Sequence, residues 1–166
     1  LTTLFGSALT TTQVAAMQPA DVAALTTAGV VALTTAQVAA LTTAQINKLS
    51  ATQVAALTTD QVTAIETADI RALTTAQIRA FSTDQIVALT TDQIANITTA
   101  QIKVLTSTQV AAMETDDVQA LTTAQIKVMT TAQLRAMETD QIAALTTDQV
   151  GALTSAQVAK LNTDQI

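Results

Sequence analysis

An eight-residue repeat is the feature that most limits how this chain can fold. Residues 32–49, ALTTAQVAALTTAQINKL, contain nearly the same phrase twice, and the phrase returns along all 166 residues without insertion or deletion. With Leu1, Leu9 and Met17 numbered as position 1, the chain holds twenty complete repeats and a partial one that ends at Ile166. The fold must therefore give successive eight-residue segments equivalent environments.

Four of the eight positions have a fixed chemical character. Position 1 is a large apolar residue throughout, and position 6 is Val, Ile or Leu in twenty repeats, with Gly6 the exception. Position 5 is Gln in sixteen repeats and position 8 is Ala in fifteen, whereas positions 4 and 7 vary and carry most of the charge. We interpret positions 1, 6 and 8 as core and positions 4 and 7 as surface. The core residues predicted from representative repeats are Leu33, Val38, Leu41, Ile46, Leu57, Val62, Leu73 and Ile78.

An eight-residue period excludes one continuous α-helix. Eight residues turn through about 800° at 3.6 residues per turn, so the apolar positions of successive repeats would spiral around the helix. A coiled coil requires a period of seven or eleven residues. Either the helix ends once in every repeat, or the chain forms β-structure.

The threonine at position 2 predicts where each helix ends and the next begins. A Thr at the N-cap followed three residues later by Gln forms a capping box, in which each residue's side chain accepts a hydrogen bond from the other's backbone N–H. Positions 1 and 6 then form the hydrophobic staple that flanks such a cap. Pro19 lies at position 3, which this register makes the first helical residue, where proline is favoured. The predicted capping residues are Thr34, Gln37, Thr42, Gln45, Thr58, Gln61, Thr74 and Gln77.

We therefore predict an all-α protein, an α-solenoid (superhelix) with one very short helix per repeat. Such helices are not stable alone and must pack against their neighbours. Glu66, Glu114 and Glu138 lie at position 2 of repeats whose ordinal number is divisible by three, which indicates a 24-residue period and three repeats per solenoid turn. The alternative is a three-sided β-solenoid, because Thr, Val and Ile favour strands. The frequent Ala and Gln favour the helical alternative.

The array is predicted to be a single domain over residues 1–166. Residues 1–8, LTTLFGSA, diverge most, because Phe5 replaces Gln and Gly6 replaces Val. We interpret them as a terminal cap or a junction, and residues 161–166 as a truncated last repeat. Because the chain begins at Leu1 and stops within a repeat, we expect it to be a segment of a longer array.

The composition offers little for catalysis. The chain has no His, Cys or Tyr, so most general bases, nucleophiles and soft metal ligands are missing. Four of its serines, Ser50, Ser82, Ser107 and Ser155, are interpreted as helix caps. We therefore predict no enzyme, no catalytic residue and no cofactor.

Charge and hydropathy also limit the partners. The net charge is −6, with only seven Lys and Arg, so the chain lacks the basic surface that nucleic-acid binding requires. No apolar run approaches the roughly 20 residues that span a bilayer, so we expect no membrane span.

Two arrays of polar residues are candidates for binding. Hard cations bind clusters of carboxylate oxygens, but the helix dipole also favours acids in a first turn, and we prefer capping and solubility. The threonines at position 3 form a second array, whose hydroxyls are candidates for contacts with ice or glycans. The candidate metal ligands are Glu114, Asp116, Asp117, Glu138 and Asp140.

The repeats LTTAQVAA, FSTDQIVA and LTTDQIAN resemble the threonine-rich tandem octapeptide arrays of large bacterial repeat proteins. With the predicted architecture, this resemblance implies a spacer, stalk or scaffold segment of a secreted or cell-surface bacterial protein, with other modules of the same chain as partners. One alternative is a binding module that uses the threonines or positions 4 and 7 to contact a protein, glycan, ice or a cation. Another is a module that self-associates end to end into a filament.

Overall fold

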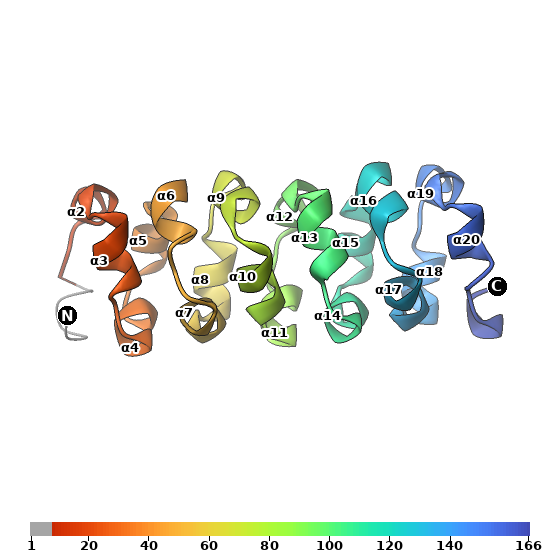
Figure 1. Ribbon diagram of the computed structural model, residues 1–166, viewed down its shortest axis with the longest axis horizontal. Helices are drawn as coiled ribbons and strands as arrows, with labels where there is room; N and C mark the ends of the chain where they lie inside the picture. Colours follow the sequence, from red (N-terminus) through yellow and green to blue (C-terminus); the bar gives the residue numbers. More distant parts are fainter. Residues whose placement is uncertain (1–7) are drawn as a thin grey trace.

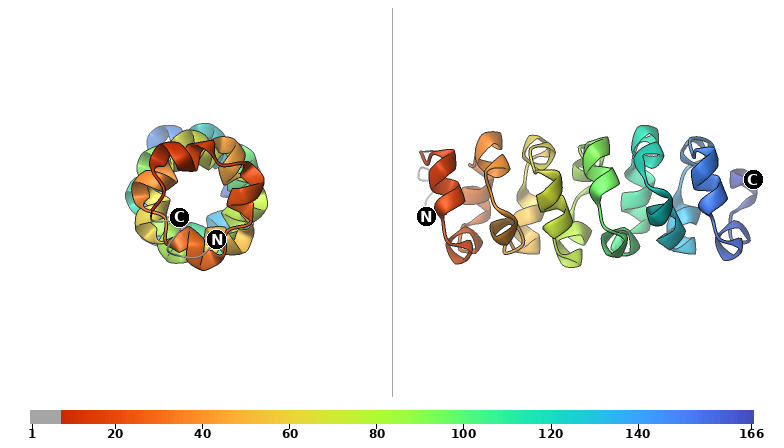
Figure 2. Two further views of the ribbon diagram at one scale, coloured as in Figure 1. Left: turned by 90° about the vertical axis from the view of Figure 1, so that its left-hand side faces the viewer. Right: turned by 90° about the horizontal axis from the view of Figure 1, so that it is seen from above.

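The computed structural model describes residues 8–166, which form a right-handed solenoid of short α-helices (Figure 1). Viewed from the N-terminal end, the helices follow a ring that turns clockwise as the chain recedes (Figure 2, left). Nineteen α-helices, one per repeat, are followed by one 3₁₀-helix, and this part of the chain contains no strand. The predicted α-solenoid is confirmed, and the β-solenoid alternative is wrong because the repeats within residues 8–166 form short helices.

The helices are α2 (Thr11–Ala16), α3 (Pro19–Ala23), α4 (Thr27–Val31), α5 (Thr35–Ala39), α6 (Thr43–Ile46), α7 (Ala51–Ala56), α8 (Thr59–Thr63), α9 (Thr67–Ala72), α10 (Thr75–Ala80), α11 (Thr83–Val87), α12 (Thr91–Asn96), α13 (Thr99–Val104), α14 (Ser107–Ala112), α15 (Thr115–Ala120), α16 (Thr123–Val128), α17 (Thr131–Ala136), α18 (Thr139–Ala143), α19 (Thr147–Ala152), α20 (Ser155–Val158) and η1 (Thr163–Gln165). None of those in residues 8–166 is long and apolar enough to cross a membrane. The predicted divergent features at Phe5 and Gly6 lie outside the described residues.

Each helix begins after the position-2 residue, whose backbone is extended. Thr34, the N-cap of α5, has φ −72° and ψ 160°. At the other end, Leu57 follows α7 with φ −57° and ψ 139°, so the chain leaves the helix through an extended residue. No residue of the described chain has positive φ. The connections therefore need no glycine, which explains how the fold forms with three glycines in the whole sequence.

Each helix packs against the helices three repeats before and after it. For example, α7 contacts α4 and α10, and α12 contacts α9 and α15. Side chains at positions 1 and 6 form one buried apolar cluster that runs from Val14 to Met137. The residues predicted to be core have exposed fractions of 0 to 6%: Leu33, Val38, Leu41, Ile46, Leu57, Val62, Leu73 and Ile78.

The contacts between each helix and the third helix along the chain match the predicted three repeats per turn, but a turn is slightly longer than three repeats. Side-chain hydrogen bonds between turns join residues 28 and 31 positions apart, between three and four repeats. A solenoid turn therefore takes slightly more than three repeats. In Figure 1, α6, α9, α12 and α16 reach the upper edge in succession, so the step is sometimes three helices and sometimes four.

Candidate functional site

The glutamine at position 5 is the polar residue on which the architecture depends most. In α13, the Gln101 backbone N–H donates to Thr98 Oγ1 at 3.2 Å, and Gln101 Oε1 accepts from the Thr98 backbone N–H at 2.7 Å. This capping box supplies partners for two backbone donors at the helix start. The same two bonds join Thr34 with Gln37, Thr58 with Gln61, and Thr74 with Gln77. Thr42 and Gln45 also form a capping box, in which the Thr42 N–H donates to Gln45 Oε1 at 2.8 Å.

The other half of the glutamine side chain binds the preceding solenoid turn. Gln101 Nε2 donates to the carbonyl oxygens of Ile70 at 2.8 Å and Leu73 at 2.7 Å. Both carbonyls lie at the C-terminal end of α9, where carbonyl groups lack partners within the helix. Each position-5 glutamine from Gln37 to Gln165 donates in this way to the position-1 carbonyl 28 residues earlier. One buried side chain therefore completes the start of its own helix and the end of another.

The capping-box prediction does not include the bond from the position-5 glutamine to the preceding turn, although the sequence contains a signal for it. Position 5 contains sixteen glutamines and no glutamate. Glutamate closes a capping box equally well and is favoured by the helix dipole. Only an amide provides an acceptor for its own helix and a donor for the carbonyls of the preceding turn. The preference for Gln over Glu therefore indicates that this side chain also donates a hydrogen bond to an acceptor outside its own capping box.

Two interior repeats replace this glutamine by aspartate. Asp69 and Asp117 have exposed fractions of 4% and 3%, and each follows a glutamate at the N-cap. Burial, with the nearby charge of Glu66, raises the pKa of Asp69 to about 6 from 3.8. Burial also raises the pKa of Asp117 to about 6; the hydrogen bond from the Glu114 N–H opposes this, and the charges of Glu114 and nearby Asp116 add to it. Both carboxylates are thus disfavoured in their ionised form.

Five segments match the family model described as the ALTTAQ repeat: residues 14–51, 30–64, 62–99, 110–147 and 134–163. They cover most of the chain. The chain belongs to the ALTTAQ repeat family. The predicted likeness to tandem threonine-rich octapeptide arrays is confirmed. Comparisons with curated proteins and with solved structures find no match.

The remaining acidic candidates of this ALTTAQ array lie on its surface. Glu114, Asp116, Glu138 and Asp140 are all exposed. In α18, Gln141 keeps the usual amide bonds, with Nε2 at 3.0 Å from Val110 O and 2.6 Å from Met113 O. Within residues 8–166, no group of three or more acidic, His or Cys side chains could hold a metal ion. The backbone N–H of Glu114 donates to Asp117 Oδ2 at 3.3 Å, which joins two members of the predicted set.

The serines divide into two groups. Ser50 and Ser82 are N-caps whose hydroxyls accept from the N3 backbone N–H. The interpretation of Ser107 and Ser155 as caps is wrong, because Thr106 and Thr154 hold the cap positions and these serines are the first residues of α14 and α20. The hydroxyls at position 3 therefore take no part in capping.

The position-3 threonines are mostly exposed, as Thr35 and Thr75 are. Because the helices follow a ring (Figure 2, left), these residues are distributed around the solenoid and do not lie on one flat face.

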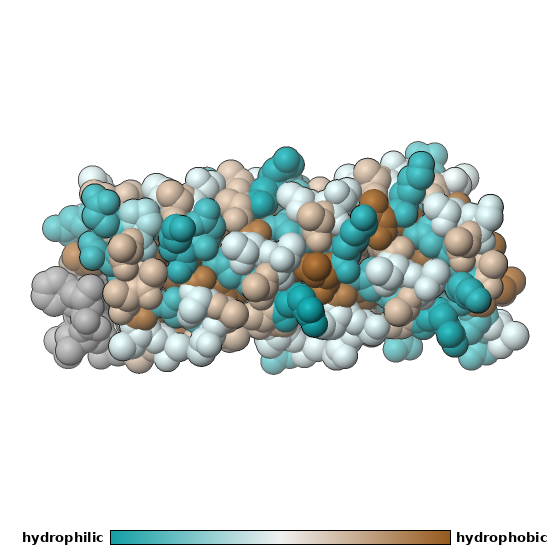
Figure 3. Space-filling view, in the orientation of Figure 1, coloured by the Kyte–Doolittle hydropathy of each residue, from teal (hydrophilic) through white to brown (hydrophobic). Residues whose placement is uncertain are grey.

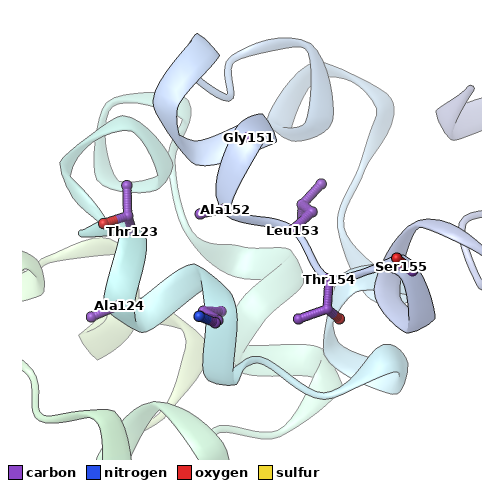
Figure 4. Close-up of a pocket in the computed structure, with 8 residues that line it drawn as sticks. Thr123, Ala124, Gly151, Ala152, Leu153, Thr154 and Ser155 are labelled. Atoms are coloured by element: carbon purple, nitrogen blue, oxygen red, sulfur yellow. The ribbon is translucent and has the colours of Figure 1, made fainter.

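A surface groove of about 670 Å³ lies between two solenoid turns near the C-terminal end (Figure 4). Lys127 and Thr123 line it on α16, and Gly151, Thr154 and Ser155 line it on the later turn. Gly151 occupies position 7, where an added Cβ would meet no atom within 4 Å. Gly151 therefore contributes no side chain to this groove. Its single charged residue, Lys127, makes an anion or a carbonyl oxygen the ligand chemistry it could accept.

Proposed function

We propose that this ALTTAQ array is a non-enzymatic spacer, stalk or scaffold segment of a larger secreted or cell-surface bacterial protein. The observation that supports this function most is the repeated inter-turn bonding from Gln37 to Gln165. Because every turn is attached to the previous one by the same bonds, repeats can be added or removed without changing the joint between turns. The number of repeats then sets the distance between the modules at either end.

The packing favours a stiff rod over a flexible linker. Ile94 and Ile102 are 1% exposed, and their apolar cluster continues through successive turns without interruption. The face seen in Figure 3 has scattered hydrophilic side chains and only small hydrophobic areas between them. A stiff rod with such a surface holds two modules apart without binding to its surroundings.

The spacer function is tested by arrays of increasing length. One, two or three copies of residues 73–96 are inserted after Asn96, and the maximum dimension is measured by small-angle X-ray scattering. A rod lengthens by an equal step for each 24-residue insertion, about 8–10 Å, the distance between packed helices. Unequal steps, or growth with the square root of length, would show a flexible chain and refute the proposal.

A further inference from the structure

Three basic residues form a stripe along one side of the solenoid. Arg79, Lys103 and Lys127 occupy position 7 of α10, α13 and α16, and all three are exposed. The stripe runs from turn to turn along the rod, because α13 packs against both α10 and α16 (Figure 1). We call these three residues the basic stripe. Since the whole chain has seven Lys and Arg, the stripe concentrates a large share of its positive charge on one side.

Three acidic residues form a second stripe on another side. Asp92, Asp116 and Asp140 occupy position 4 of α12, α15 and α18, and all three are exposed. We call them the acidic stripe, which also runs from turn to turn because α15 packs against both α12 and α18. The exposed N-caps Glu114 and Glu138 add negative charge to the same two helices. Because successive helices follow the ring (Figure 2, left), α12 lies on a different side of the solenoid from α10 and α13.

The two stripes have the same spacing. Successive residues within each stripe are 24 residues apart in the sequence. The charges of both signs therefore recur at the same interval along the rod. Within residues 8–166, none of the six side chains forms an ion pair inside the chain. Their charges are therefore available to an external partner whose opposite charges repeat at this interval.

The residues beside the stripes differ in size. Val104 and Val128 directly follow the second and third residues of the basic stripe and are partly exposed, whereas most repeats have alanine at this position. The helices of the acidic stripe have the smaller Ala120 and Ala144 at the equivalent position. Larger apolar side chains beside one stripe and smaller ones beside the other allow the two surfaces to pack closely within a charged rim.

We propose that copies of this array associate side by side, with the basic stripe of one copy against the acidic stripe of the next. A second copy is the partner that these observations favour, because it carries the opposite charges at the matching interval. Since the two stripes lie on different sides, the contact is heterologous, and each added copy leaves one stripe of each sign free. Association therefore extends laterally and does not stop at a dimer. The proposal goes beyond the spacer function, because it adds a contact between neighbouring arrays.

The contact is expected to be weak and sensitive to salt. Each pair of exposed opposite charges stabilises a contact only slightly, and the net charge of −6 on each copy opposes association. In 0.1 M salt the screening length is about 10 Å, so paired charges in contact still attract while repulsion between the two rods as a whole is weakened. In 1 M salt the screening length is about 3 Å, and the paired charges are screened as well.

Sedimentation velocity from 10 µM to 1 mM, in 0.1 M and 1 M NaCl, tests the contact. The sedimentation coefficient of the wild type is expected to rise with concentration in 0.1 M NaCl, and the association constant is expected to be at least about tenfold lower in 1 M NaCl. Far-UV circular dichroism verifies that each variant folds. Two variants each reverse the charges of one stripe and are expected to remain monomeric: R79E/K103E/K127E and D92K/D116K/D140K.

A matched control separates the acidic stripe from the overall charge. D60K/D84K/D148K changes three exposed aspartates that also occupy position 4 but lie outside this stripe, on α8, α11 and α19. It has the same net charge as the variant of the acidic stripe, and it is expected to associate at least as strongly as the wild type. A mixture of the two stripe variants is also expected to associate, because one keeps the acidic stripe and the other keeps the basic stripe.

The proposal would be overturned by a wild type that stays monomeric at 1 mM, or by association that persists unchanged when either stripe is reversed. Loss of association in D60K/D84K/D148K would assign the contact to the overall charge or to another surface. A mixture of the two stripe variants that stays monomeric would show that the basic stripe of one copy does not face the acidic stripe of the next.

Discussion

Replacing Gln101 by glutamate removes the inter-turn donor and changes little else. The side chain keeps its length, and Oε1 still accepts from the Thr98 backbone N–H. The amide nitrogen that binds the Ile70 and Leu73 carbonyls at 2.8 and 2.7 Å becomes an oxygen that repels them. Gln101 is 2% exposed, so water cannot substitute for the lost donor.

The cost of this change is large for a single substitution. Two lost hydrogen bonds contribute about 2 kcal/mol. Burying a carboxylate without a partner raises the total to roughly 3–5 kcal/mol at neutral pH. For a chain of this size, each kcal/mol lowers the unfolding midpoint by about 2–4 °C, so the expected decrease is about 6–20 °C. At pH 4 the loss is expected to be smaller, because a protonated glutamate can donate one of the two bonds.

The assay is thermal and urea unfolding followed by far-UV circular dichroism at pH 4 and pH 7. The control is A100E, which adds the same charge on the exposed surface at the second residue of α13. There the helix dipole favours a carboxylate, so the stability is expected to stay within about 0.5 kcal/mol of wild type. If Q101E were no less stable than A100E at pH 7, the inter-turn glutamine bond would not stabilise the solenoid.

Three further changes test other parts of the structure. The free energy of unfolding of the wild type is expected to fall between pH 3.8 and about 6, because in that range unfolded Asp69 and Asp117 lose protons that the folded chain retains. The decrease is at most about 3 kcal/mol per residue and less where solvent screens the charge, and D69Q should remove its own share in urea titrations across this range. I94A is expected to lower the free energy of unfolding by about 2–5 kcal/mol in urea denaturation, because Ile94 is 1% exposed in the core. The control V87A changes a side chain that is 42% exposed and should be nearly neutral. Equal losses in the two variants would contradict the assignment of position 6 as core. F81L restores the commonest position-1 residue and is expected to change the free energy of unfolding by less than about 1.5 kcal/mol in the same urea assay. A decrease of about 3 kcal/mol or more would show that Phe81 has a packing role specific to its repeat.

Much of the fold follows from local chemistry that the sequence displays openly. Thr34 and Gln37 have the spacing of a capping box, and Pro19 lies where only a helix start accepts it. These features fix the helix boundaries because they depend on neighbouring residues alone. The contacts between third neighbours agree with the spacing of Glu66, Glu114 and Glu138, which lie 48 and 24 residues apart, because equivalent environments select equivalent residues.

The inter-turn hydrogen bonds could not be predicted from these features. Gln101 reaches Leu73 because the end of one helix faces the start of another in the next turn, and the offset of 28 residues depends on how the turns stack. No local pattern contains that offset. For the same reason, the burial of Asp69, which is 4% exposed, could not be predicted from its neighbours in the sequence.

Hydrogen exchange of the glutamine side-chain amides, measured by ¹⁵N NMR, tests most directly whether these groups hold the turns together. The account predicts slow exchange for the position-5 amides from Gln37 to Gln165, whose Nε2 groups donate to the preceding turn. It predicts fast exchange for Gln13, Gln18 and Gln119, which are exposed. Fast exchange of all the glutamine amides at one common rate would contradict it.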